Sequence, residues 1–139
     1  MYIKSAKLYQ DFIDRGFISH IAYSNYAVIL QNLGNFSEAE ILTRKAIEVN
    51  SNFADAYSNL GSILNIKGNL NEAEVVTRKA LSLNPNSSNT NRILGSILIN
   101  LGKFAEAEIF FRKAIDLNPD FVEAYSGLAN VLRCLSKYK

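Results

Sequence analysis

The sequence has little of what catalytic, metal-binding or disulfide-stabilised proteins depend on. Its 139 residues include one cysteine, one histidine and no tryptophan. The single Cys134 excludes an intramolecular disulfide and fits a reducing compartment, and the single His20 belongs to no metal-ligand spacing. No Ser/His/Asp or Cys/His constellation and no glycine-rich phosphate-binding loop can be assembled. We therefore expect a chain that is not an enzyme and that holds no cofactor and no metal.

Net charge and long apolar runs are also scarce. The formal net charge of +2 is too small to indicate nucleic acid or an anionic membrane as a partner. The longest apolar runs fall far short of the ~20 residues that a helix needs to cross a bilayer. A hydrophobic content of 48% with 20% charged residues is typical of a globular protein. We expect a soluble, cytoplasmic protein that binds neither nucleic acid nor membrane.

What the sequence does contain is a repeat with a period of 34 residues. Gly34, Gly68 and Gly102 are spaced by this interval, and so are Pro85 and Pro119. Whole triplets recur with the same period, Glu-Ala-Glu at 38–40, 72–74 and 106–108, and Arg-Lys-Ala at 44–46, 78–80 and 112–114. Such a period indicates one supersecondary unit stacked on copies of itself, because a single unit cannot bury its apolar face alone.

Each unit has the pattern of two helices. In residues 54–87, apolar side chains recur at helical spacing over about residues 54–67 and again over about residues 71–83. Gly68 predicts the end of the first helix, since glycine readily adopts the left-handed conformation common just past a helix end. Pro85 ends the second, because the residue before proline disfavours further helix. The unit is therefore predicted to be an antiparallel helical hairpin.

Charged residues predict helix starts and an outer face. Ser37 followed by Glu40 has the spacing of a capping box, and so has Asp120 followed by Glu123. Acid–base pairs with i,i+4 spacing recur in every copy, as Glu40–Arg44, Glu74–Arg78 and Glu108–Arg112. Such pairs stabilise a helix by only ~0.2–0.5 kcal/mol each, so a repeated run of them is typical of a solvated outer surface rather than a binding site.

The details of the unit resemble the tetratricopeptide repeat. The residues that carry the resemblance are Tyr57, Leu60, Gly61, Leu64, Gly68, Ala73, Ala80 and Pro85. The pattern is nearest to the repeat arrays of O-GlcNAc-transferase-like and bacterial tetratricopeptide proteins. The resemblance implies an all-α fold, a right-handed α-α superhelix of antiparallel helical hairpins. Asn91 departs from the pattern, because a tyrosine stands at this position in the other copies, and we expect its repeat to be the softest.

The resemblance covers nearly the whole chain as a single solenoid. Residues 1–19 correspond to a degenerate second helix of a preceding repeat, and residues 122–139 to the first helix of an incomplete or terminal one. The full repeats between them are residues 20–53, 54–87 and 88–121. We expect the apolar stripe of the last helix to have no following partner; its residues are Tyr125, Leu128, Val131, Leu132 and Leu135. Two hypotheses follow: the chain is a piece of a longer array, or this uncapped C-terminal helix forms a homo-oligomer.

The resemblance also implies a binding groove. In the family, the side of each first helix that does not pack against its neighbours lines the concave surface where partners bind. The residues expected there are Ser24, Asn25, Val28, Asn32, Asp55, Asn59, Ser62, Asn89, Arg92, Ser96, Glu123, Asn130 and Arg133. Short amides and hydroxyls can hydrogen-bond a peptide backbone without demanding a particular side chain. Asparagines that hold an extended peptide in O-GlcNAc-transferase-type repeats match Asn25 and Asn59, and this ladder breaks at Ile93 and Gly127.

These features favour a non-catalytic scaffold for protein–protein interaction that binds a peptide segment of a partner protein. The alternatives are a substrate-recognition arm of a larger glycosyltransferase-like enzyme, a self-association module, and a polar face that merely keeps exposed helices soluble. A clamp for the acidic C-termini of heat-shock chaperones is disfavoured, because of its expected lysine, arginine and asparagine positions only Asn59 matches. The bound segment could be extended or helical.

Overall fold

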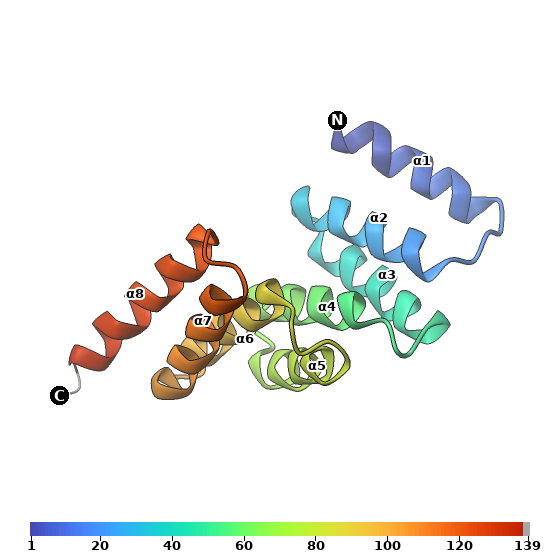
Figure 1. The fold of residues 1–139 in the computed structure, drawn as a ribbon. Helices are drawn as coiled ribbons and strands as arrows, with labels where there is room; N and C mark the ends of the chain where they lie inside the picture. The colour runs from blue at the N-terminus through green and yellow to red at the C-terminus, as the bar shows by residue number, and fades with distance from the viewer. Residues whose placement is uncertain (138–139) are drawn as a thin grey trace.

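The computed structural model describes residues 1–137, and all of their regular structure is helical (Figure 1). The helices are α1 (Tyr2–Asp14), α2 (His20–Asn32), α3 (Phe36–Val49), α4 (Ala54–Ile66), α5 (Leu70–Leu83), α6 (Ser88–Asn100), α7 (Phe104–Leu117) and α8 (Val122–Lys137). The last two residues of the chain, which close the predicted terminal repeat, lie outside the described part. The predicted all-α fold is confirmed.

The helices are arranged as a row of hairpins. The most extensive helix contacts join α2 to α3, α4 to α5 and α6 to α7, and weaker contacts link each hairpin to the next. We call α2, α4, α6 and α8 the first helices and α3, α5 and α7 the second helices. Helix α1 contacts α2 and no other described helix, so α1 and α8 lie at opposite ends of the row (Figure 1).

Glycine ends the first helices, as the spacing predicts. Gly34, Gly68 and Gly102 have φ angles of 83°, 83° and 75°, in the left-handed region. After α2, the N–H of Gly34 donates to the carbonyl of Gln31 at 3.0 Å and the next N–H donates to that of Leu30 at 2.8 Å. This pair of bonds satisfies carbonyls that the helix end leaves free.

The predicted capping boxes are wrong. Helix α3 begins at Phe36, so Ser37 lies inside the first turn, and its flanking Asn35 makes no side-chain cap. Asp120 accepts no hydrogen bond from a described helix start; its own N–H donates to Asn118. Side-chain caps occur instead at the residues directly before α2 and α6. Ser19 Oγ accepts from the N–H of Ala22 at 3.3 Å, and Ser87 Oγ accepts from the N–H of Thr90 at 3.2 Å.

The core consists of three apolar clusters that follow the row of hairpins. The first contains Tyr26, Ala27, Leu30, Ala39, Leu42 and Ile63, the second Leu60, Leu64, Ala73, Ile93 and Ile97, and the third Leu94, Leu98, Ala107, Phe111 and Val131. Each cluster draws residues from more than one hairpin. Neighbouring hairpins therefore bury each other's apolar faces, as expected of a solenoid.

Two predictions about packing are refined. Val131 is fully buried and Leu128 and Leu135 are partly buried against the third cluster, so only Tyr125 and Leu132 of the predicted apolar stripe of α8 are exposed. Asn91 is also fully buried: its Nδ2 donates to the carbonyl of Ser87 at 2.8 Å, while its Oδ1 accepts no hydrogen bond from a described residue. An unpaired buried oxygen of this kind costs stability, and the softness of this repeat stays a prediction.

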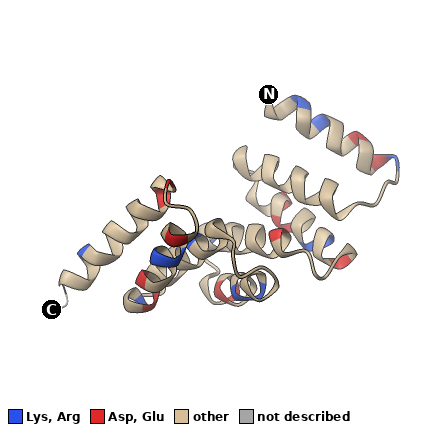
Figure 2. Ribbon diagram, in the orientation of Figure 1, with Lys and Arg blue, Asp and Glu red and all other residues tan. Residues whose placement is uncertain are grey.

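Charged residues gather on α1 and on the second helices (Figure 2). The three predicted i,i+4 pairs are present, and other ion pairs connect one second helix to the next. Arg44 binds Glu40 of its own helix at 2.9 Å and Glu72 of α5 at 2.8 Å, and Arg78 pairs in the same way with Glu74 and with Glu106 of α7. The predicted solvated outer face is therefore also a link between hairpins.

Candidate functional site: a polar groove over the first helices

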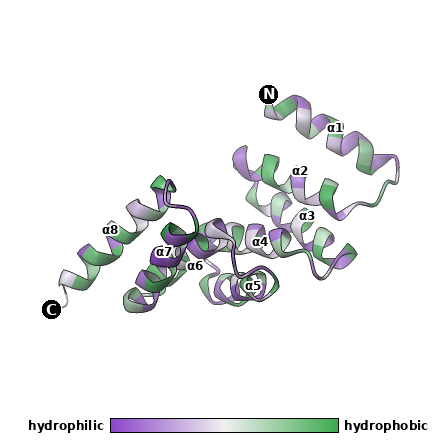
Figure 3. Cartoon of the chain, viewed as in Figure 1, coloured by the Kyte–Doolittle hydropathy of each residue, from purple (hydrophilic) through white to green (hydrophobic). Residues whose placement is uncertain are grey.

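Three of the first helices, α2, α4 and α6, form a face that is almost free of charge. Helix α2 has no charged residue, α4 has only Asp55 and α6 has only Arg92, and Figure 2 shows the contrast with the second helices. The hydropathy colouring of Figure 3 shows that these helices are mixed rather than uniformly apolar. The exposed residues of these three helices combine asparagines with apolar side chains: they are Asn25, Asn32, Asn89 and Asn100, the apolar Ile21, Val28 and Ile66, and Asp55.

A hollow of about 290 Å³ lies across α2, α4 and α6. Its lining residues are Ser24, Asn25, Val28, Phe53, Asp55, Ser58, Asn59, Ser87, Asn89 and Thr90. We call this hollow the first-helix groove. It lies where three helices are aligned side by side, so that equivalent positions of successive repeats contribute equivalent side chains.

Part of the polar lining connects the helices to one another. Asn59 Nδ2 donates to Ser24 Oγ at 3.2 Å, between α4 and α2, and Thr90 Oγ1 donates to Ser58 Oγ at 3.0 Å, between α6 and α4. Both serines are buried, with 4% of their surface exposed. Such bonds satisfy polar groups that hairpin packing removes from water. These serines therefore have a structural role in addition to lining the groove.

The same kind of contact continues outside the groove. Gln31 Nε2 donates to Ser62 Oγ at 3.0 Å, and Asn100 Nδ2 donates to Asn65 Oδ1 at 2.8 Å. These bonds again join consecutive first helices. A row of short polar side chains thus runs between α2, α4 and α6 and keeps the three helices in register.

Other hydrogen-bonding groups of the groove are left for a ligand. The Nδ2 of Asn25 donates to Tyr9 at 3.2 Å and that of Asn59 to Ser24, but the Oδ1 of neither accepts a bond from a described residue. Asn89 has the opposite arrangement, because its Oδ1 accepts from Arg92 at 3.0 Å and its Nδ2 is free of described partners. The groove therefore offers both acceptors and a donor, which is what a peptide backbone requires.

Arg92 is held at the edge of this arrangement. Its guanidinium lies 5.7 Å from the centre of the Phe121 ring, in addition to its hydrogen bonds with Asn89. Burial lowers the pKa of Arg92, and the nearby Glu123 opposes this shift. The side chain stays cationic, as arginine does in proteins, and its position is fixed by the ring and the amide.

Six of the thirteen predicted groove residues line the hollow, and the other seven do not. Ser24, Asn25, Val28, Asp55, Asn59 and Asn89 line the hollow. Those that do not line it are Asn32, Ser62, Arg92, Ser96, Glu123, Asn130 and Arg133. Of the six, Ser24 is buried and bonded to Asn59, so that little of it is available to a partner.

Sequence reasoning missed Phe53 and Ser87, which also line the groove. Each is the residue directly before a first helix, α4 or α6. The signal was available in the repeat register, because the two residues are 34 positions apart and flank helices already assigned to the groove. Thr90 was missed as well, since its position is predicted to pack against neighbouring helices, and it is indeed buried.

A metal-ligand cluster and a membrane-spanning helix are both absent from the described residues. No three histidine, cysteine, aspartate or glutamate side chains of residues 1–137 lie close enough together to hold a metal ion. None of the described helices combines the length and apolar character needed to cross a membrane. The first-helix groove is therefore the candidate site that we compare with known proteins.

Two family models match the chain, both of them described as tetratricopeptide repeat. One matches residues 54–87, and the other matches residues 20–53 and 93–121. Together the matched segments cover most of the sequence. No curated protein matches the sequence significantly.

Solved structures with the same fold include tetratricopeptide domains of several proteins. The first such domain of human RPAP3 has a TM-score of 0.81 and 19% identity, covering 85% of this chain and 93% of that domain. YrrB, described as a protein with an unusual peptide-binding site, has a TM-score of 0.79 and 26% identity, covering 91% and 66%. A mutant O-GlcNAc transferase of Thermobaculum terrenum has a TM-score of 0.80 and 25% identity. The alignment covers 81% of this chain but only 22% of the transferase.

Proposed function

The chain belongs to the tetratricopeptide repeat family, and from this premise we propose that its first-helix groove binds a peptide segment of a partner protein. Domains of this family are protein–protein interaction modules. The observation that carries the proposal is the set of amide groups of Asn25, Asn59 and Asn89, which line one hollow and retain hydrogen-bonding atoms without described partners. In this role the chain is a scaffold and performs no chemistry itself.

The chemistry of the groove supports recognition of the peptide backbone rather than of charged side chains. Its lining includes one charged residue, Asp55, whereas arginine clusters are the usual device for acidic motifs. Free amide oxygens at Asn25 and Asn59 can accept N–H groups, and the free Nδ2 of Asn89 can donate to a carbonyl. Val28 adds an exposed apolar contact between these amides.

Structural neighbours support the same proposal. The first tetratricopeptide domain of Spaghetti (RPAP3), 19% identical to this chain, has been solved with an HSP90 peptide bound. YrrB, at 26% identity, is described as having an unusual peptide-binding site. Peptide binding is thus a use to which this fold is put in both proteins.

Panning a phage-displayed library of random peptides against the chain tests the proposal. We expect enriched peptides whose affinity for the Asn25→Ala/Asn89→Ala variant is weaker by ~10-fold or more, because two hydrogen bonds to the ligand are lost. A matched control, Lys45→Ala/Lys79→Ala, changes exposed residues of α3 and α5 and should bind as the parent does. Circular dichroism verifies that both variants are folded. Peptides that bind the asparagine variant and the parent equally would overturn the proposal.

A second candidate is a substrate-recognition arm of a larger modifying enzyme. The similarity to the Thermobaculum terrenum O-GlcNAc transferase favours it, since the aligned region is a small part of that chain. This candidate uses the same groove but predicts that the coding sequence continues past Lys139 into a catalytic domain. Sequencing the gene beyond this codon separates the two: a stop codon there contradicts the second candidate and leaves the first intact.

A further inference from the structure

The two ends of the solenoid expose faces that helices bury elsewhere in the chain. On α8, Tyr125 and Leu132 have 47% and 42% of their surface exposed, and Ala129 between them is exposed too. The three residues lie on one side of the helix, because residues four and seven positions apart fall on the same face. We call them the α8 stripe.

In every other first helix a second helix covers this stripe. The equivalent residues, found by the period of 34, are Tyr23, Ala27 and Leu30 of α2, Tyr57, Gly61 and Leu64 of α4, and Asn91, Gly95 and Leu98 of α6. The contact is close, because a Cβ on Gly61 would lie 1.9 Å from Thr77 of α5 and one on Gly95 would lie 2.7 Å from Phe111 of α7. The α8 stripe thus has the shape of a surface that a second helix covers, but no helix of residues 1–137 covers it.

Helix α1 has an exposed side too, but it is the side on which a first helix would pack. Its residues Ala6, Tyr9 and Ile13 pack against the first core cluster, just as Ile47 of α3 packs against the second. This is the side that a second helix presents to the following first helix. A different side, made of Ser5, Leu8 and Phe12, is not covered in this way: Leu8 has 72% of its surface exposed. We call these three residues the α1 stripe.

The register shows what normally covers the α1 stripe. Its members lie 34 residues before Ala39, Leu42 and Ala46, all of which are buried in the α2–α3 hairpin. In α3 this side faces the first helix of the same hairpin. The α1 stripe is therefore the side of a second helix that lacks its own first helix among the described residues.

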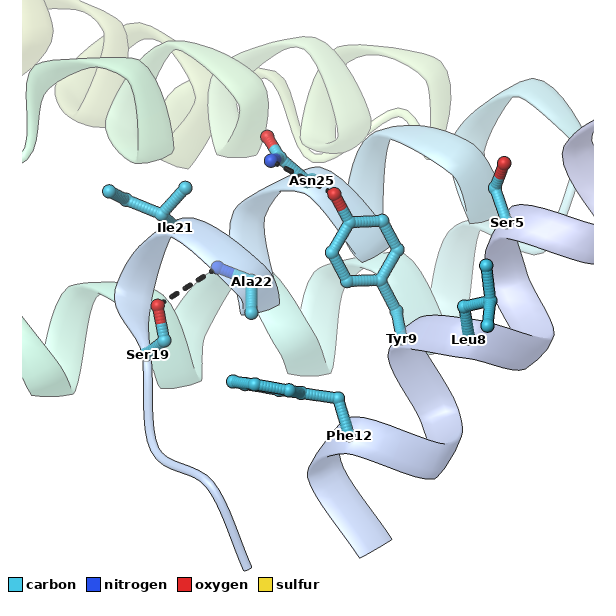
Figure 4. Close-up of a pocket in the computed structure, with 8 residues that line it drawn as sticks. All are labelled: Ser5, Leu8, Tyr9, Phe12, Ser19, Ile21, Ala22 and Asn25. Carbon is cyan, nitrogen blue, oxygen red and sulfur yellow. Dashed lines mark hydrogen bonds between the residues drawn. The ribbon is translucent and has the colours of Figure 1, made fainter. Parts of the chain in front are cut away.

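A hollow marks the place of that helix (Figure 4). Its volume is about 560 Å³, and it is lined by Ser5, Leu8, Tyr9, Phe12, Ser19, Ile21, Ala22 and Asn25. The lining comes from α1 and α2 and contains no charged residue, and Figure 4 shows the side chains of Tyr9, Leu8 and Phe12 along its α1 side. A first helix stacked before α2 would contact both of these helices, as α2 contacts its own second helix α3 and the next first helix α4.

We propose that α8 of one copy docks against α1 of a second copy, so that the two ends together form a further hairpin. The α8 stripe needs a second helix and the α1 stripe needs a first helix, and α1 and α8 are helices of those two kinds. Neither stripe carries a charge, so contact between the two stripes does not bury a charge of either one. The contact continues the stacking that already joins the hairpins within the chain.

The docked ends fit less closely than the hairpins of the chain. Phe12 stands where the other second helices have an alanine, Ala46, Ala80 or Ala114, at a closely packed point. The larger ring holds the facing helices further apart. Association is therefore expected at micromolar rather than nanomolar concentrations. Because the contact joins two different surfaces at opposite ends of the molecule, it is heterologous, and each dimer keeps one free end of each kind through which assembly continues.

Sedimentation velocity across a concentration series of the 139-residue chain tests this proposal. We expect a mean mass that rises with concentration past that of a dimer. Leu132→Glu blocks the α8 stripe and Leu8→Glu blocks the α1 stripe, each weakening association by ~10-fold or more because a charge must be desolvated. Each variant alone should be monomeric. An equal mixture of the two should form dimers and nothing larger, because only one intact pair of ends remains.

The controls distinguish this arrangement from other forms of association. Ile109→Glu changes an exposed apolar residue of α7 outside both stripes and should assemble as the parent does. Should Leu8→Glu or Leu132→Glu lose its helical circular dichroism signal, Ser5→Glu or Tyr125→Glu takes its place. A parent chain that stays monomeric up to about 1 mM overturns the proposal. So does a single variant that still dimerises alone, which would indicate pairing of like ends. Asn25 lines both this hollow and the first-helix groove, so peptide binding in the groove is measured at concentrations at which the chain is monomeric.

Discussion

At the scale of single residues, the Phe111 ring of α7 determines how closely α7 packs against α6 and α8. Its ring is fully buried and lies between two glycines, since an added Cβ would be 2.7 Å from the ring at Gly95 and 2.1 Å at Gly127. In the preceding repeat the equivalent of Phe111 is Thr77, and the equivalent of Gly127 is Ile93, which is 4% exposed. We infer that a small residue on the second helix leaves room for a large one on the next first helix, and the reverse.

This dependence of side-chain size on the facing residue explains why the asparagine ladder ends after Asn59. Asn25 and Asn59 occupy the positions that Ile93 and Gly127 take in the later repeats. Ile93 was expected on the groove side, but it belongs to the second core cluster. Gly127 is required by the Phe111 ring rather than by a ligand. The ladder is thus interrupted by packing.

The substitution Gly127→Ala tests the role of the Phe111 ring. We expect it to lower the free energy of unfolding by ~1–3 kcal/mol through overpacking, although alanine favours a helix by ~1 kcal/mol relative to glycine. Urea denaturation measures the change. In a Phe111→Leu background the same substitution should no longer destabilise the chain, and an unchanged cost there would contradict the account.

At the scale of the helices, sequence reasoning succeeded where one residue type determines the local structure. Glycine at 34, 68 and 102 gave the ends of α2, α4 and α6, because left-handed backbone strongly favours glycine. Helix starts were harder to predict, because Ser37 fits a capping box in sequence and yet lies within the first turn of α3. Gly16 also has a left-handed φ of 84°, and it was missed since it lies outside the period of 34.

Ion pairs of two second-helix carboxylates, Glu40 of α3 and Glu74 of α5, make stability depend on pH. The hydrogen bond from Lys67 is the main cause that lowers the pKa of Glu40 below 4.5, and that from Lys103 has the same effect on Glu74. A carboxylate whose pKa is lower in the folded state stabilises the fold at pH values above its unfolded pKa. This contribution is lost as the pH falls through the folded pKa.

We therefore expect the melting temperature to fall when the pH is lowered from about 7 to about 3, and to fall less in a Glu74→Gln variant. At neutral pH the variant should be the less stable of the two, since it lacks the pairs with Arg78 and Lys103. Glu48→Gln is the control, because Glu48 is exposed and forms no ion pair with a described residue. Equal pH dependence of the parent and Glu74→Gln would show that these pairs do not contribute.

At the scale of the whole molecule, repetition made the fold predictable and the site only partly so. The period assigns each residue to a face, and this was enough to place Asn25, Asn59 and Asn89 in one groove. It could not show that Ser24 is buried and bonded to Asn59, or that no α8 residue lines the hollow. Both depend on how far successive hairpins turn relative to one another, which side-chain sizes at each contact determine.

Amide chemical-shift mapping of the ¹⁵N-labelled chain, titrated with a peptide selected by display, tests the proposed groove most directly. We predict that the shifts that change cluster on α2, α4 and α6, around Asn25, Asn59 and Asn89, while those of α3, α5 and α7 change little. Changes centred on the second helices, or confined to α1 and α8, would contradict the assignment of this groove as the peptide-binding site.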